Sequence, residues 1–249
     1  MKPKLSYTIW FTQRTGSTLL CQALESTGIA GRPGEWLAKQ NLPEDYNQMT
    51  RTELQKQLWD IASTSNGVLA IKHSFYEPHF GLLMEVFKGF PNCPPGETNR
   101  ATIWSNGFPN HHHIFMTRRN KVRLAVSWWK AIQSQEWHRV RGEKAKIVDL
   151  RDAYSFEAIR HLYLECSMRE AGIQEFLSEG NISPLTIVYE DFTQCYEETI
   201  KRVLEFLGLD HRSINVPTPS LDRTADDISE EWTQRFRREI QEGWENRGW

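Results

Sequence analysis

Residues 7–24 constrain the fold more than any other part of the chain. Residues 7–12 are rich in β-branched and aromatic side chains, which favour a strand. A polar turn with one glycine follows at 13–16, and residues 17–27 repeat apolar side chains at helical spacing. A strand that turns through a glycine into a helix directs backbone N–H groups and the positive end of the helix dipole at one point. The pattern therefore predicts either an anion pocket or a plain strand–turn–helix crossover with an exposed arginine.

The residues of this turn bear on which anion could bind. The P-loop of nucleoside triphosphatases and their kinase relatives requires G-x-x-x-x-G-K-S/T. This chain has one glycine and no lysine in the turn, and Arg14 stands before Gly16. A kinase of the P-loop class is therefore a poor fit. Arg14 offers a planar set of donors suited to phosphate or sulfate oxygens, and Ser17 and Thr18 add hydroxyl groups.

Length and charge limit the classes of protein that the chain can belong to. Its 249 residues suit one large α/β domain or two small ones, and a net charge of −2 gives no indication of nucleic-acid binding. The four cysteines are scattered without a C-x-x-C pair, as is typical of reduced thiols. The first apolar run is interrupted by Gln13 and Arg14, so neither a signal peptide nor a membrane span is predicted. We expect a cytoplasmic protein.

Strands and helices alternate along the rest of the chain, which predicts an α/β fold with a mainly parallel central sheet flanked by helices. No repeat or linker divides it, so we expect a single domain over residues 1–249. Residues 89–107 are rich in Pro, Asn and Gly without a clear period and are predicted to be a long loop or lid. Further strands are predicted at 67–71, 112–117 and 184–189. Helices are predicted at 51–63, 78–87, 122–132, 197–207 and from 229 onward, with one or two helices within 149–178.

Basic residues follow two of the predicted strands. Lys72 and His73 follow the second strand, and Arg118 follows the third. Ligands of open α/β sheets gather at the carboxyl ends of strands, which would place these side chains near Arg14. Arg118 and Ser127 can share a ligand only if Arg118 precedes the next helix and folds back, because nine rises of ~1.5 Å separate them otherwise. The alternatives are a Lys72 that ends its strand in water and an Arg118 in a surface ion pair.

The histidines at 111–113 and Glu35 are two further candidates for functional residues. The three consecutive histidines at 111–113 resemble a metal-binding run, but neighbouring residues of a strand alternate between its faces. The three cannot all bind one ion, so no metal site is predicted. Glu35 follows a turn that contains Gly31, Pro33 and Gly34. Taken alone, it reads as a surface residue.

Three segments of the chain resemble motifs of the PAPS-dependent sulfotransferases of the bacterial trehalose 2-sulfotransferase type. PAPS is 3′-phosphoadenosine 5′-phosphosulfate. Residues 13–20 resemble the family's 5′-phosphosulfate loop, with Gln-Arg where most relatives have Pro-Lys. Arg118 with residues 125–129 resembles its 3′-phosphate motif, and residues 31–35 resemble the segment that carries its proposed base. Residues 133–137, 189–191 and 221–232 also look familial, so the resemblance extends from about residue 7 to 232.

The resemblance implies a P-loop-like sulfotransferase fold and transfer of a sulfuryl group from PAPS to a hydroxyl of a carbohydrate or glycolipid, without a metal. Glu35 would be the general base, with His73 as a competing candidate because many relatives use a histidine shortly after the second strand. Arg14 would stabilise charge, since it cannot give up a proton at neutral pH. A P-loop-type kinase and a non-catalytic nucleotide-binding protein are the alternatives, and a homo-oligomer is left open. The residues implied to bind PAPS are Gln13, Arg14, Thr15, Gly16, Ser17, Thr18, Arg118, Ser127 and Arg223.

Overall fold

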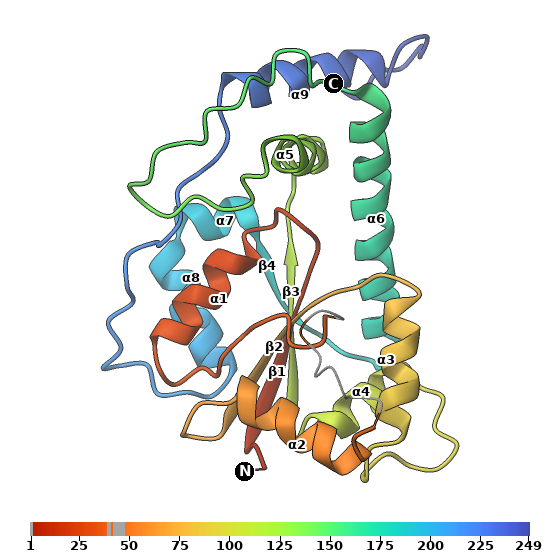
Figure 1. Cartoon of the computed structure of the whole chain (residues 1–249), viewed down its shortest axis with the longest axis vertical. Helices are drawn as coiled ribbons and strands as arrows, with labels where there is room; N and C mark the ends of the chain where they lie inside the picture. The colour runs from red at the N-terminus through yellow and green to blue at the C-terminus, as the bar shows by residue number, and fades with distance from the viewer. Residues whose placement is uncertain (1, 39–40, 42–47) are drawn as a thin grey trace.

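The computed structural model describes residues 2–38, 41 and 48–249, and its elements alternate as β/α units (Figure 1). The strands are β1 (Leu5–Phe11), β2 (Val68–Ser74), β3 (His111–Thr117) and β4 (Leu185–Val188). The helices are α1 (Ser17–Ser26), α2 (Arg51–Ala62), α3 (His79–Lys88), α4 (Arg100–Gly107), α5 (Lys121–Ser134), α6 (Phe156–Glu179), α7 (Tyr189–Gln194), α8 (Tyr196–Phe206) and α9 (Asp227–Glu239).

Within the described residues the central sheet is parallel, in the order β2-β1-β3-β4. This confirms the predicted α/β class. In a parallel sheet the carboxyl ends of all strands lie at one edge, so the segments that follow β1, β3 and β4 start beside one another. The edge of the sheet at which they start is the place where a ligand site is expected.

Side chains of successive strand residues alternate between two cores. On one face, Ile9 and its neighbours pack with α1, α7 and α8. On the other face, Trp10 and Ile71 pack with α2, α3, α4 and the C-terminal half of α6. Figure 1 shows α1 and α8 on one side of the sheet and α3 and α6 on the other. A third cluster joins α5, the N-terminal half of α6 and α9 beyond the carboxyl edge of the sheet.

Several predicted boundaries need correction. Residues 100–107 are not loop but form α4, which begins after Asn99, whose side chain accepts a hydrogen bond from the Thr102 N–H. The helix is only eight residues long and follows a stretch rich in Pro, Asn and Gly, so its period is hard to recognise in the sequence. The strand predicted at 67–71 continues to Ser74. The 149–178 region holds one helix, which begins only at Phe156.

The histidine run lies in β3 and alternates as predicted. Nδ1 of His113 accepts a hydrogen bond from Nε1 of Trp10 at 2.9 Å, in one core. The His112 ring lies edge-on to Phe206, on the α8 side. The three side chains are therefore divided between the two faces. No described helix combines the length and apolar composition that crossing a membrane requires.

Candidate active site

The β1–α1 turn presents the start of α1 without a side-chain cap from the described residues. Gly16 has φ of 80°, in the left-handed region that glycine adopts without strain. A Cβ built on it would lie 2.8 Å from the Tyr189 ring, so a side chain has no room there. Hydroxyl Oγ1 of Thr15 donates to the Thr12 carbonyl at 2.7 Å and fixes the turn. The first N–H groups of α1 and the positive end of its dipole are left for an anion.

A cavity of about 270 Å³ opens at this helix start. Its walls come from the turn, from α5, from α7 and from residues 219–225. Seven of the nine residues predicted to bind PAPS line it: Arg14, Gly16, Ser17, Thr18, Arg118, Ser127 and Arg223. The other two lie elsewhere: Thr15 is buried beneath the turn, and Gln13 points to Ser74 and Arg169.

Arg14 lies at the centre of this wall. Its Nε donates to Ser127 Oγ at 2.9 Å and its Nη2 donates to Thr224 Oγ1 at 2.9 Å, while Nη1 donates to the Trp137 carbonyl. Burial, and then the neighbouring charge of Arg118, lower the Arg14 pKa to about 10. The side chain therefore stays protonated at neutral pH. Its three acceptors are uncharged, so its positive charge is available to an anion in the cavity.

Arg118 supplies a second positive charge on the cavity wall. It follows β3 and precedes α5, which is the arrangement required for it to share a ligand with Ser127. Its guanidinium lies over the Tyr189 ring, 4.6 Å from the centroid, and its Nε is 3.6 Å from Glu190 Oε1. That buried Nε has no hydrogen-bond partner in the described part of the chain, and burial lowers the Arg118 pKa. The ion pair with Glu190 holds the guanidinium in place, and Arg118 brings a second positive charge to the cavity wall.

Glu35 is held next to the same helix start by a lysine. Gly34 forms an isolated parallel bridge with Ile71 of β2, and its carbonyl accepts a hydrogen bond from the Lys72 N–H at 2.9 Å. This pairing places Glu35 Oε1 2.9 Å from Lys72 Nζ, which also donates to Thr18 Oγ1 at 3.1 Å. Lys72 is 8% exposed, whereas the Glu35 side chain is 43% exposed. A solvent-accessible carboxylate is thus connected through one ammonium group to the first turn of α1.

His73, the competing base, lies on the opposite face of the sheet from Lys72. It is 4% exposed and packs against Trp10 and Trp104, with ring centroids 5.7 and 5.3 Å away. Its Nε2 is buried and finds no partner among the residues described. Burial, and then the charge of His79, lower the His73 pKa to about 3. The structure therefore places the two candidate bases in different surroundings, one beside the helix start and one in an aromatic core.

Comparison with known proteins shows the family of the chain. Residues 6–239 match the family model described as Stf0 sulphotransferase. The chain belongs to the Stf0 sulphotransferase family. It is 29% identical to the trehalose 2-sulfotransferase of Mycolicibacterium smegmatis, over 95% of this chain and 96% of that protein. It is 28% identical to the trehalose 2-sulfotransferase of Mycobacterium tuberculosis, over 94% of each.

The fold of this Stf0 sulphotransferase agrees with a solved structure. The crystal structure of a sulfotransferase from Alicyclobacillus acidocaldarius superposes with a TM-score of 0.51 at 14% identity, covering 97% of this chain and 95% of that one. The structural likeness supports the P-loop-like sulfotransferase fold that the sequence predicts.

A strap of two chain segments, residues 137–142 and 219–225, covers the cavity of this Stf0 sulphotransferase. Val140 and Leu221 form an antiparallel bridge, and the Asp222 N–H donates to the Arg139 carbonyl at 2.9 Å. No sequence pattern indicates this strap, because apolar residues do not recur at helical or strand spacing in either segment. The strap carries His138, whose Nε2 is 3.4 Å from Thr18 Oγ1. Burial, and then the charges of Arg14 and Lys72, lower the His138 pKa.

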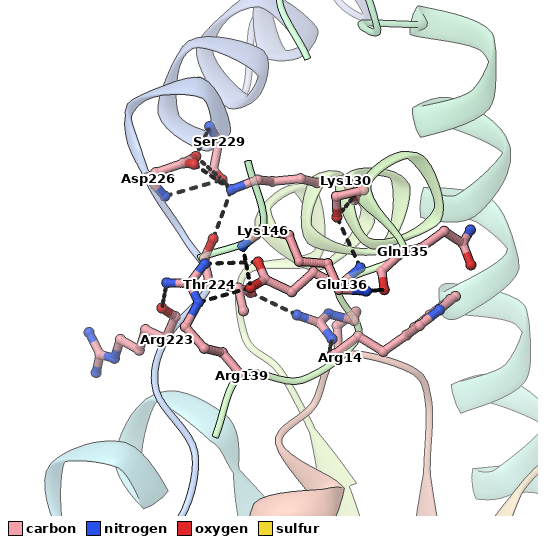
Figure 2. Close-up of polar contacts among 12 residues, drawn as sticks. Arg14, Lys130, Gln135, Glu136, Arg139, Lys146, Arg223, Thr224, Asp226 and Ser229 are labelled. Carbon is pink, nitrogen blue, oxygen red and sulfur yellow. Dashed lines mark hydrogen bonds and ion pairs between the residues drawn. The ribbon is translucent and has the colours of Figure 1, made fainter. Parts of the chain in front are cut away.

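Two ion pairs hold the strap on this Stf0 sulphotransferase (Figure 2). Lys130 Nζ is 2.6 Å from Asp226 Oδ2 and donates to the Thr224 carbonyl at 2.8 Å. Glu136 accepts two hydrogen bonds from Arg139, at 2.8 and 3.0 Å. These pairs hold Thr224 against Nη2 of Arg14, so the strap and the anion-binding turn form one network.

Proposed function

We propose that the protein transfers the sulfuryl group of PAPS to a hydroxyl of a carbohydrate or glycolipid acceptor, with Glu35 as the general base. The observation that carries the proposal is the placement of Arg14 and Arg118 on one cavity at the start of α1, with a carboxylate joined to the same helix turn through Lys72. This arrangement suits a ligand with phosphate at two ends. The identity of the relatives supports a sugar as the acceptor.

The cavity residues divide between the two ends of the nucleotide. The N–H groups of Ser17 and Thr18, together with Arg14, would hold the 5′-phosphate and the transferring group. Arg118 and Ser127 would hold the 3′-phosphate, because both line the cavity and Arg118 carries a positive charge. Bound PAPS supplies the sulfuryl group and a phosphate leaving group. No metal is invoked, because the two guanidinium groups supply the positive charge.

Transfer of a sulfuryl group resembles phosphoryl transfer in relying on in-line positioning and on stabilisation of charge at the bridging oxygen. Arg14 is suited to that stabilisation, because it stays protonated. Glu35 would accept the proton of the acceptor hydroxyl, and Lys72 would fix the carboxylate relative to Thr18. His73 is a poor base, since it is buried in an aromatic core on the other face of the sheet.

The test is transfer of radiolabelled sulfate from PAPS to trehalose, and then to a cell extract with mass spectrometry of the labelled product. Glu35→Gln should lower turnover by roughly 10²–10⁴-fold, the usual contribution of a general base. PAP, the desulfated nucleotide, should still raise its melting temperature. Glu85→Gln is the matched control, because Glu85 is an exposed acid paired only at the surface with Lys88. Full turnover in Glu35→Gln would refute the assignment of the base.

A further inference from the structure

Arg169 of α6 reaches the start of the β1–α1 turn, although 156 residues separate it from Gln13. Its Nη1 donates to Gln13 Oε1 at 3.1 Å and to Ser74 Oγ at 3.1 Å. Its Nη2 donates to Glu165, one helical turn away. The Arg169 side chain is only 16% exposed. The guanidinium is therefore held in one place, and it in turn orients an amide and a hydroxyl group at the edge of the sheet.

Two aromatic rings help to hold this guanidinium. It lies 5.1 Å from the centroid of Tyr76 and 5.4 Å from that of Trp128. Trp128 is buried, whereas Tyr76 is 36% exposed, so part of the Tyr76 ring faces solvent. Cation–π contacts favour arginine over lysine at such a position, because the planar guanidinium can stack and donate at once.

The order of the strands places the Arg169 guanidinium on the opposite side of Arg14 from the nucleotide cavity. β2 neighbours β1 on one side, and β3 and β4 lie on the other. The cavity is lined by residues that follow β3 and β4, among them Arg118 and Tyr189. Ser74 ends β2, on the same side as Lys72 and Glu35. In-line transfer requires the acceptor oxygen to approach opposite the leaving phosphate, and hence from the β2 side.

The hydrogen bonds leave specific donors free on that side. Ser74 Oγ accepts hydrogen bonds from Arg169 Nη1 and, at 3.4 Å, from Gln13 Nε2, so the hydroxyl proton of this 6% exposed residue remains to be donated. Gln13 Oε1 is occupied by Arg169, which fixes the orientation of the amide and leaves its second N–H to donate. Donors of this kind recognise the oxygens of a polyhydroxylated molecule.

We propose that Arg169 is a positioning residue for the acceptor: it holds Gln13 and Ser74 so that they select a polyhydroxylated acceptor over one with a single hydroxyl group. This inference rests on the proposed function, and it deepens that function by assigning acceptor selection to residues outside the nucleotide cavity. It also gives Gln13 a different role from binding of PAPS.

The experiment compares transfer from labelled PAPS to trehalose, glucose, glycerol and phenol by the wild type, Arg169→Met and Gln13→Leu. The wild type should favour the sugars. Each variant should raise the sugar KM by roughly 10- to 100-fold, because a site built to bind hydroxyl groups loses its partners, while the KM for PAPS stays within about twofold. The sugar KM of the double variant should be no higher than that of either single variant, since the two residues act as one unit.

Arg160→Met is the matched control, because Arg160 also lies on α6 but makes only an exposed pair with Glu157. If Arg169→Met unfolds, Gln13→Leu still tests the idea. If the KM for PAPS and the KM for sugar rise equally, or if the sugar KM does not change, Arg169 only stabilises the packing of α6 against the sheet and does not position the acceptor. A wild type that sulfates phenol in preference to sugars would overturn this inference and leave a sulfotransferase. Absence of transfer to every acceptor would overturn the proposed function and this inference with it.

Discussion

Replacement of His73 by phenylalanine tests whether this side chain is a base or part of the core. Its imidazole packs among Trp10, Phe80 and Trp104, and its Nε2 has no partner within the described structure. A phenyl ring of similar shape removes this buried polar atom. We therefore expect His73→Phe to fold, to keep its turnover at neutral pH, and to be at least as stable as the wild type.

The magnitude follows from the pKa of His73, which burial lowers to about 3 in the folded protein from 6.5. Between these values the unfolded chain binds a proton that the folded protein does not, so His73 makes folding less favourable as pH falls below 6.5. One pKa unit corresponds to about 1.36 kcal/mol, so at about pH 5 the loss from His73 alone is about 2 kcal/mol. His73→Phe removes this contribution and leaves those of the other histidines unchanged.

Urea unfolding at about pH 7.5 and about pH 5 measures the effect as a free energy of unfolding. Between these pH values the wild type should lose about 2 kcal/mol more than His73→Phe. Equal losses in the two proteins would refute the reasoning on burial. A hundredfold fall in turnover of His73→Phe at neutral pH, with normal stability, would instead make His73 the base.

Three further substitutions test other parts of the account. Gly16→Ala should lower the free energy of unfolding by roughly 1–3 kcal/mol in thermal unfolding and weaken PAP binding, because the left-handed φ is strained for alanine and the Tyr189 ring must shift. Unchanged PAP binding would contradict the role of the β1–α1 turn in binding the nucleotide. Lys121→Met should destabilise by roughly 3–5 kcal/mol in urea, since it removes the charged partner of the buried Glu170 carboxylate, which then keeps the hydrogen bond from the Thr117 hydroxyl; a loss below about 1 kcal/mol would contradict this. Arg118→Met should reduce the rise in melting temperature that PAP causes, measured from the melting temperature of the same variant without ligand; an undiminished rise would contradict the role of Arg118.

The parts of the site that sequence predicts are those encoded locally. The strand, turn and helix around Gly16 are contiguous, and Arg118 can be assigned to a strand end from the apolar run before it. The contact of Glu35 with Lys72 depends instead on Gly34 pairing with the edge of β2, which no local pattern reveals. The sequence names Glu35 only through its resemblance to a family.

Other elements were missed for related reasons. His138 reaches Thr18 only because the two segments of the strap pair with each other, and neither has a regular period. Helix α4 was predicted as loop because it is only eight residues long and follows a stretch rich in Pro, Asn and Gly. Arg169 gave no signal at all, since a single arginine in a long amphipathic helix is ordinarily a surface residue, and its partners lie far away in sequence.

The central claim is that one cavity binds both ends of a nucleotide with two phosphate groups, and thermal melting with PAP and AMP tests it most directly. AMP lacks the 3′-phosphate that Arg118 would hold. We predict that PAP stabilises the wild type by about 2.7 kcal/mol at a hundred times its Kd. AMP at the same concentration should stabilise it far less, and Arg118→Met should respond alike to the two nucleotides. Equal responses of the wild type to PAP and AMP, or no response to millimolar PAP, would contradict the claim.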